Sequence, residues 1–199
     1  MTWHQFFGTL SVVVAVISFY PYLRDILARK TTPHIYSWLV WTILQVTATA
    51  AILRENSFWS AAGVLSLGLV SLIVFLLSFK YGTKNITVFD TVCLIGAFIA
   101  ISVWIFTSNV TLSIILVTII DLIAFLPTFR KAFEEPHSET IFLYICSAIS
   151  NLFSVLSITH YSVESTLYVA SLVATNTVFV SMVLVKRMPK RLSVSIPKE

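Results

Sequence analysis

The stretch Tyr20-Pro21-Tyr22-Leu23-Arg24 returns later in the chain as Leu126-Pro127-Thr128-Phe129-Arg130, with the central proline at position 127 instead of 21. Pro33-His34 follows the first copy, and Pro136-His137 follows the second. Each copy joins two apolar stretches that are long enough to cross a membrane. The repeat predicts a duplicated helical bundle in a bilayer, and internal symmetry of this kind in a small membrane protein favours transport.

The composition places the chain in the membrane class. Hydrophobic residues make up 57% of the 199 residues and charged residues only 11%, whereas about a quarter of the residues of a soluble domain are charged. A helix needs about 20 apolar residues to cross the hydrocarbon core. Seven stretches meet that need, and we expect them at 5–23, 35–53, 58–79, 87–107, 110–129, 140–159 and 165–185.

The repeat also predicts how these helices are grouped. Aligning the two proline segments pairs spans one, two and three with spans five, six and seven, and leaves span four without a partner. We therefore expect an all-α membrane protein with two parallel three-helix bundles joined by a linker helix, a 3-1-3 plan. The corresponding boundaries are 1–82 for the first repeat, 83–108 for the linker helix, 109–188 for the second repeat and 189–199 for a cytosolic tail.

The basic residues predict the orientation. Twelve of the thirteen Lys and Arg residues fall on one side of the predicted topology, and Arg54 alone falls on the other. The positive-inside rule then puts the N-terminus outside and the C-terminus in the cytoplasm, with the cell membrane as the expected location. The net charge of +4 is explained by this bias and by attraction to anionic lipid, so it requires no nucleic-acid partner.

The two proline segments and the seven-span plan resemble the PQ-loop superfamily, which includes the SWEET sugar facilitators. The resemblance covers nearly the whole chain at the level of topology and is sharpest at Pro21-Tyr22 and Pro127-Thr128. Tyr22 and Thr128 stand where the family has glutamine, so the chain is similar to a divergent member. The resemblance implies a transporter that works by alternating access and that contacts its substrate through an asparagine in the third helix of a repeat, which corresponds here to Asn176.

Each central proline has two alternative roles. Proline cannot donate to the carbonyl four residues earlier, so Pro21 and Pro127 could act as hinges at which the two bundles rock against each other. Alternatively, each proline simply terminates its span, because both stand within about one turn of the predicted span ends.

Polar side chains inside the spans indicate a solute site. Thr140, Tyr144, Ser147, Asn151 and Ser154 share one face of span six. Such a stripe can pack helices closely and bond to its own backbone. Asparagine in mid-helix is not expected to bond to its own backbone in this way, so we expect Asn151 to face a cavity. Near mid-membrane, the predicted solute-binding residues are Trp41, Gln45, Tyr144, Asn151 and Asn176.

Asp121 is the one carboxylate predicted to lie well inside a span. An ionised aspartate there costs about 2.5–3.5 kcal/mol on insertion scales, so the group should be neutral, paired or facing water. It is a candidate for proton coupling. The alternatives are a carboxylic acid bonded to Thr118 or a neighbouring helix, and a position at the rim of a hydrated entrance.

Charged groups near the ends of the spans have simpler interpretations. We expect Glu134, Glu135 and Glu139 to form exposed ion pairs with nearby basic residues, and His34 and His137 to lie at the interface. The chain lacks the motifs of common enzymes, and the positions of its four histidines and two cysteines favour neither a metal site nor a disulfide.

These patterns predict a transporter, and not an enzyme, with no cofactor. Its partners are a small polar or amphipathic solute, such as a sugar, a nucleoside, a vitamin or an amino acid, and membrane lipid. The alternative is a receptor or a structural scaffold on the same seven-helix fold. Whether the protein is a monomer or a homo-oligomer is left open.

Overall fold

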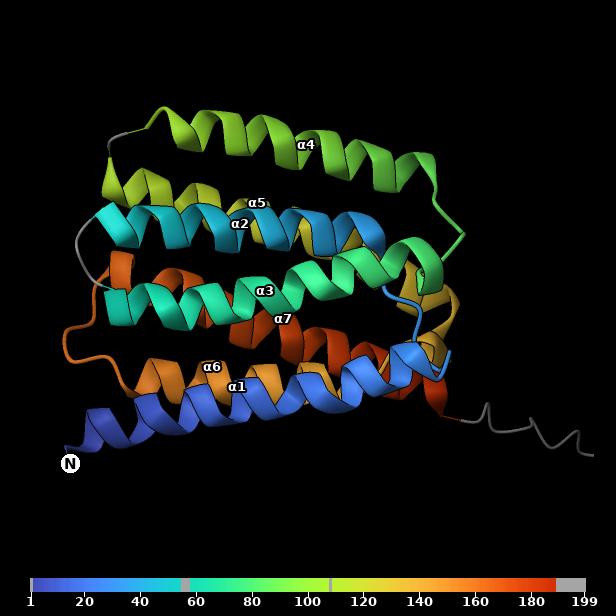
Figure 1. Ribbon diagram of the computed structural model, residues 1–199, viewed down its shortest axis with the longest axis horizontal. Coiled ribbons are helices and arrows are strands. Elements are labelled where there is room, and N and C mark those ends of the chain that lie inside the picture. Colours follow the sequence, from blue (N-terminus) through green and yellow to red (C-terminus); the bar gives the residue numbers. More distant parts are fainter. Residues whose placement is uncertain (1, 55–57, 108, 189–199) are drawn as a thin grey trace, which may run out of the picture.

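The chain is all-helical in the computed structural model (Figure 1), which describes residues 2–54, 58–107 and 109–188. Side chains are described over these ranges apart from 48–54, 58–66 and 164. The predicted tail, 189–199, lies outside the described residues. The helices are α1 (Trp3–Leu27), α2 (Ile35–Arg54), α3 (Phe58–Tyr81), α4 (Val88–Ile105), α5 (Val110–Glu134), the short 3-10 helix η1 (Pro136–Ser138), α6 (Ile141–Leu156) and α7 (Val163–Arg187).

The fold class expected from the sequence is confirmed at the level of an all-helical chain with several apolar helices. By length and composition, four described helices can cross a membrane: Trp3–Leu27, Val88–Ile105, Val110–Glu134 and Ser165–Arg187. Three further apolar segments are shorter: Ile35–Thr47, Leu67–Tyr81 and Ile141–Leu156. The chain is therefore described as a multi-pass membrane protein.

The prolines lie inside their helices. Pro21 is within α1, which continues to Leu27, and Pro127 is within α5, which continues to Glu134. The interpretation of these prolines as terminators is wrong, because the chain returns to helical hydrogen bonding after each of them. The expected span ends at 23 and 129 were too early for the same reason.

Some helices pack on their neighbours in the sequence, and others pack on helices that are far away in the sequence. α2 packs on α3, and α6 packs on α7. α1 lies along α6, whereas α2 lies along α5. α5 also packs on α7, whereas α1 touches α3 more sparsely. α4 covers α5 and reaches α2 at one edge of the bundle (Figure 1).

One end of the bundle carries most of the basic residues and most of the core. We call it the basic end; there α1, α3, α5 and α7 finish (right side of Figure 1). Its basic residues are Arg24, Arg29, Lys30, Lys80, Lys84, Arg130, Lys131, Lys186 and Arg187. The larger core cluster lies in this half of the bundle, with Ile26 of α1 and Val183 of α7 fully buried. At the opposite end, Trp3, Val110 and Tyr161 are exposed.

Candidate functional site

Five rings from five helices close the bundle near the basic end. These residues, which we call the aromatic plug, are Tyr22, Trp38, Phe125, Tyr144 and Phe179. The centroids of the Tyr144 and Phe179 rings lie 4.3 Å apart, and those of Phe125 and Phe179 lie 5.3 Å apart. Each ring is at most 4% exposed. Tyr144, predicted as a solute ligand, is therefore part of a packed plug.

Trp41 and Asp121 meet beside this plug. The ring centroid of Trp41 lies 5.3 Å from that of Phe125, and its side chain is within hydrogen-bonding reach of the Asp121 carboxyl. Tyr168 of α7 lies within electrostatic range of the same carboxyl. Asp121 is 4% exposed. Two of the predicted functional residues, on different helices, are thus brought together.

The two predicted asparagines make bonds within their own helices. Asn151 Nδ2 donates to the carbonyl oxygen of Ser147 at 2.8 Å, and Asn176 Nδ2 donates to that of Leu172 at 2.8 Å. The expectation that Asn151 would avoid bonding to its own backbone is wrong. The side-chain amide of an asparagine can reach the backbone carbonyl oxygen four residues earlier, as the hydroxyls of serine and threonine do. Gln45, half-buried on α2, lies where α2 and α3 approach closely, since a Cβ on Gly68 would sit 3.2 Å from the Gln45 Cβ.

A buried ion pair at the basic end was missed by the sequence analysis. Lys131 Nζ bonds to Glu139 Oε1, and neither side chain is exposed. Glu139 Oε2 accepts hydrogen bonds from Tyr22 Oη at 3.3 Å and Tyr144 Oη at 3.2 Å. The expectation of an exposed, weak pair was wrong for Glu139 because α5 continues past Pro127, which carries Lys131 into the interior.

A second buried acid, Asp90, is held at the start of α4. Asp90 forms a capping box with Thr87, because each side chain bonds to the other residue's backbone N–H. Arg130 binds the carboxylate with two nitrogens, at 2.8 and 2.7 Å. Arg130 also donates to Glu134 at 2.7 Å, on the exposed side. Asp121 is therefore not the one buried carboxylate on these helices.

His34 lies against Asp90 and is fully buried, so the expectation of an interfacial histidine was wrong for this residue. Its Nε2 is 3.4 Å from Oδ2 of Asp90. Burial lowers the pKa of His34 to about 4, although the neighbouring Asp90 carboxylate acts in the opposite direction. The imidazole is therefore neutral at physiological pH. His137, at the matching place in the second copy, is exposed.

The three buried acids differ in their partners. Asp90 has Arg130 and Glu139 has Lys131, whereas Asp121 forms no ion pair within the described residues. A buried carboxylate without a cation is strongly disfavoured. Asp121 is thus the acid whose charge must be cancelled by a proton or by a bound cation.

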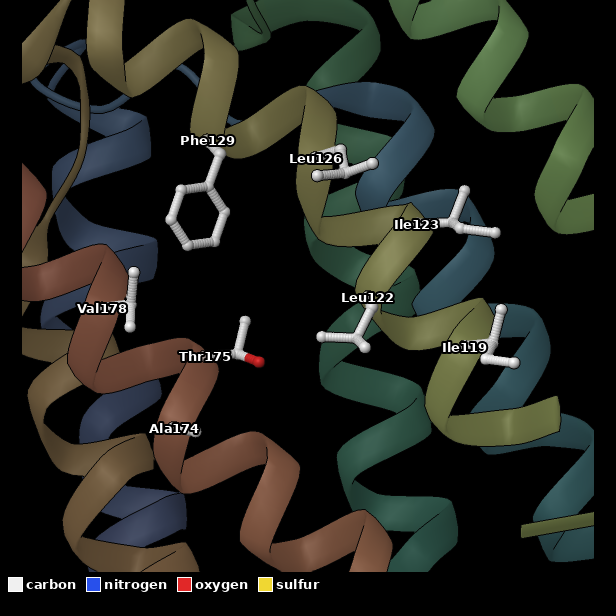
Figure 2. A pocket seen from close by; sticks show the side chains of 8 residues that line it. All are labelled: Ile119, Leu122, Ile123, Leu126, Phe129, Ala174, Thr175 and Val178. Carbon is white, nitrogen blue, oxygen red and sulfur yellow. The ribbon is translucent and has the colours of Figure 1, made fainter. Parts of the chain in front are cut away.

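An open apolar groove runs along the outside of α5 and α7 (Figure 2). Its volume is about 360 Å³, and its lining has a single hydroxyl, from Thr175. Leu122 and Leu126 point toward this groove from α5 (Figure 2). None of the predicted solute-binding residues lines it. The groove has the character of a lipid-facing surface.

Within the described ranges, no group of three or more His, Cys, Asp or Glu side chains is arranged to hold a metal ion. No family model, curated protein or solved structure matches this chain significantly. The likeness to the PQ-loop superfamily therefore rests on the two proline segments and the topology.

Proposed function

We propose that the protein is a membrane transporter that moves a small polar or amphipathic solute by alternating access between two parallel three-helix repeats. The packing supports this plan. If α1, α2 and α3 correspond to α5, α6 and α7, then the α2–α3 contact corresponds to α6–α7, and the α1–α6 contact to α5–α2. The remaining helix, α4, would be the linker.

The distribution of burial supports a bundle that is shut at one end. The aromatic plug and both buried ion pairs lie near the basic end. By the positive-inside rule the basic end would face the cytoplasm. The described arrangement would then be the state that is closed to the cytoplasm.

The observation that carries the proposal is the carboxyl of Asp121 beside Trp41, which has no cation among the side chains that the structure describes. A fully structural acid would be expected to have a cation, as Asp90 and Glu139 do. Asp121 lies one helical turn from Phe125 of the plug, where a solute entering from the opposite end would stop. It would couple transport to a proton, while Trp41, Gln45 and Asn176 would offer an aromatic face and amides to the solute.

A receptor or scaffold on the same fold is the second candidate. It is favoured by the amides of Asn151 and Asn176, which already bond to their own helices, and by the packed position of Tyr144. In that case the bundle would have no need to open, and Asp121 would simply be a protonated acid near Trp41 and Tyr168.

Binding followed by uptake separates the two candidates. A panel of sugars, nucleosides, vitamins and amino acids is first screened against the purified protein by thermal stabilisation. Any solute that stabilises it is then tested for uptake into proteoliposomes between about pH 5 and 8. Asp121→Asn should abolish the pH dependence of uptake and leave solute exchange largely intact.

Asp25→Asn is the matched control, since Asp25 is an acid on α1 that already has Arg24 and Thr140 as partners. It should keep the pH dependence. Uptake that is indifferent to pH in the unmodified protein would remove the coupling role and leave facilitated diffusion. Failure of the whole panel to bind or to be taken up would favour the scaffold.

A further inference from the structure

The two proline segments meet at the basic end, where hydrogen bonds join them. We define the first proline segment as residues 20–38 and the second as residues 126–144. Tyr22 of the first segment donates to Glu139 of the second at 3.3 Å. Thr128 of the second donates to Ser37 of the first at 2.9 Å. Both donors directly follow the central prolines.

Further hydrogen bonds cross between the same segments. Lys131 Nζ donates to the carbonyl oxygen of Thr32 at 2.6 Å, and the Thr32 N–H donates to the carbonyl oxygen of Ser138 at 3.0 Å. Thr140 donates to Asp25 at 2.9 Å. The two segments are therefore joined by buried or half-buried hydrogen bonds and not by packing alone.

The ion pair itself does not cross. Lys131 and Glu139 both belong to the second segment, and Tyr144, the other hydroxyl on Glu139 Oε2, belongs to it too. Separating the segments would leave Glu139 with its cation and one of its two hydroxyl donors. Splitting a buried ion pair costs far more than releasing a single hydrogen bond to water. The junction can therefore open without leaving an unpaired buried charge.

We infer that the hydrogen bond between Tyr22 and Glu139 forms a latch that holds the basic end shut. Lys131 fixes the position of the Glu139 carboxylate. The hydrogen bond between Thr128 and Ser37 adds a second contact across the junction. This role deepens the proposed function, because it assigns the closed gate of the transport cycle to named side chains. The gate opens when the Tyr22 hydroxyl leaves Glu139 and both groups take water as their partner. The central prolines, which leave the carbonyls of Ile17 and Ile123 without a helical N–H partner, allow α1 and α5 to bend at that point.

The test measures opening directly, without any solute. Cys93→Ser and Cys146→Ser remove the native thiols, and Ala132→Cys places one thiol at a fully buried position in the core of the basic end. The rate at which a small, water-soluble methanethiosulfonate modifies this thiol reports the population of the open state. Tyr22→Phe removes one hydroxyl and keeps the ring, so it should raise the rate about tenfold.

Tyr144→Phe is the matched control. It removes the hydrogen bond that Glu139 receives from within the second segment, together with a contact to the Tyr22 hydroxyl that Tyr22→Phe also removes. The two variants therefore differ in which donor Glu139 loses, and the latch predicts a smaller acceleration for Tyr144→Phe than for Tyr22→Phe. Equal acceleration by both variants would mean that the thiol reacts through general loosening, and no acceleration by Tyr22→Phe would mean that the bond does not hold the end shut. Either result overturns the latch.

The same rates separate the latch from the transport proposal. If Tyr22→Phe accelerates modification but no solute is taken up, the latch stands and the transport function falls. If uptake is found and depends on pH while Tyr22→Phe leaves the rate unchanged, transport stands and the latch falls. Thr128→Val offers an independent second variant, and the latch predicts a smaller acceleration than for Tyr22→Phe, because this bond joins two neutral groups.

Discussion

In both proline segments a helix continues past the proline, but the side chains that follow contrast. Four residues after its proline, the first segment has Asp25, which is partly exposed and paired with Arg24. Four residues after its proline, the second has Lys131, which is fully buried and paired with Glu139. The Pro-His pairs also differ, because His34 is buried and His137 is exposed.

These differences show what the two proline segments share and where they diverge. The helix that continues past a proline and the turn into the next helix are present in both segments. Lys131 donates to a carbonyl of the first segment, and Asp25 accepts from Thr140 of the second. At the same distance after the proline, one segment therefore donates across the junction and the other accepts.

The largest expected effect comes from breaking the buried pair in the second segment. Lys131→Met leaves Glu139 ionised and buried without a cation, which costs about 3–5 kcal/mol. Thermal or denaturant unfolding of the purified protein in detergent measures this loss. At the matching position of the first segment, Asp25→Asn should cost less than about 1 kcal/mol, since Asp25 and Arg24 form a pair near the surface.

A double variant sharpens the comparison. Adding Glu139→Gln to Lys131→Met removes the unpaired charge and should recover part of the lost stability. If Asp25→Asn and Lys131→Met lower the free energy of unfolding by the same amount, the two segments do not differ in how these positions contribute to stability.

The next effect is a pH dependence of stability that resides in one histidine. His34 has a pKa of about 4 in the folded protein and an ordinary value of 6.5. The unfolded chain therefore binds more protons between these values, and the folded state loses stability as pH falls from about 6.5 toward 4. The full loss is on the order of 3 kcal/mol.

His34→Gln should remove that part of the pH dependence, as read from melting temperatures across this range. His137→Gln, at the matching exposed position, should leave it intact. Other charged groups near His34 are Asp90, Arg130 and Lys131, and they are common to both variants. An unchanged slope in His34→Gln would assign the acid sensitivity to the carboxylates.

The smallest effect concerns the hydroxyl pair between Thr128 and Ser37. Thr128→Val keeps the shape of the side chain and removes the donor, so it should cost about 1 kcal/mol. Ser37→Ala should cost a similar amount. The double variant should cost less than the sum, because both changes remove the same bond. Strict additivity in the unfolding free energies would show that the bond contributes nothing.

The helices could be predicted from the sequence more fully than the site. Hydrophobic length located all seven helices, and the two prolines located the turns, because these signals act locally along the chain. The helix ends past Pro21 and Pro127 were missed, since the apolar stretches end near residues 23 and 129 whereas the helices continue through the polar residues that follow. With α5 ended at 129, Lys131 was assigned to a loop, and its burial with Glu139 was lost.

A better signal was present on α5. Asp121, Phe125 and Thr128 repeat at steps of four and three along one helical face, and Lys131 follows at a further step of three. Extending that face through Pro127 would have predicted a buried lysine. The meeting of Asp90, Arg130 and His34 had no such signal, because it joins three distant parts of the chain.

The length of α6 has a consequence for the surrounding lipid. α6 runs only from Ile141 to Leu156, which is about 24 Å of helix, whereas a hydrocarbon core is about 30 Å thick. α1 and α7, which pack on α6, have 25 residues each. If α6 crosses the membrane, the bilayer must thin beside it while meeting longer helices around the rest of the bundle. Such an uneven hydrophobic boundary would favour a tilted orientation of the protein in the membrane. It would also favour short or disordered acyl chains next to α6.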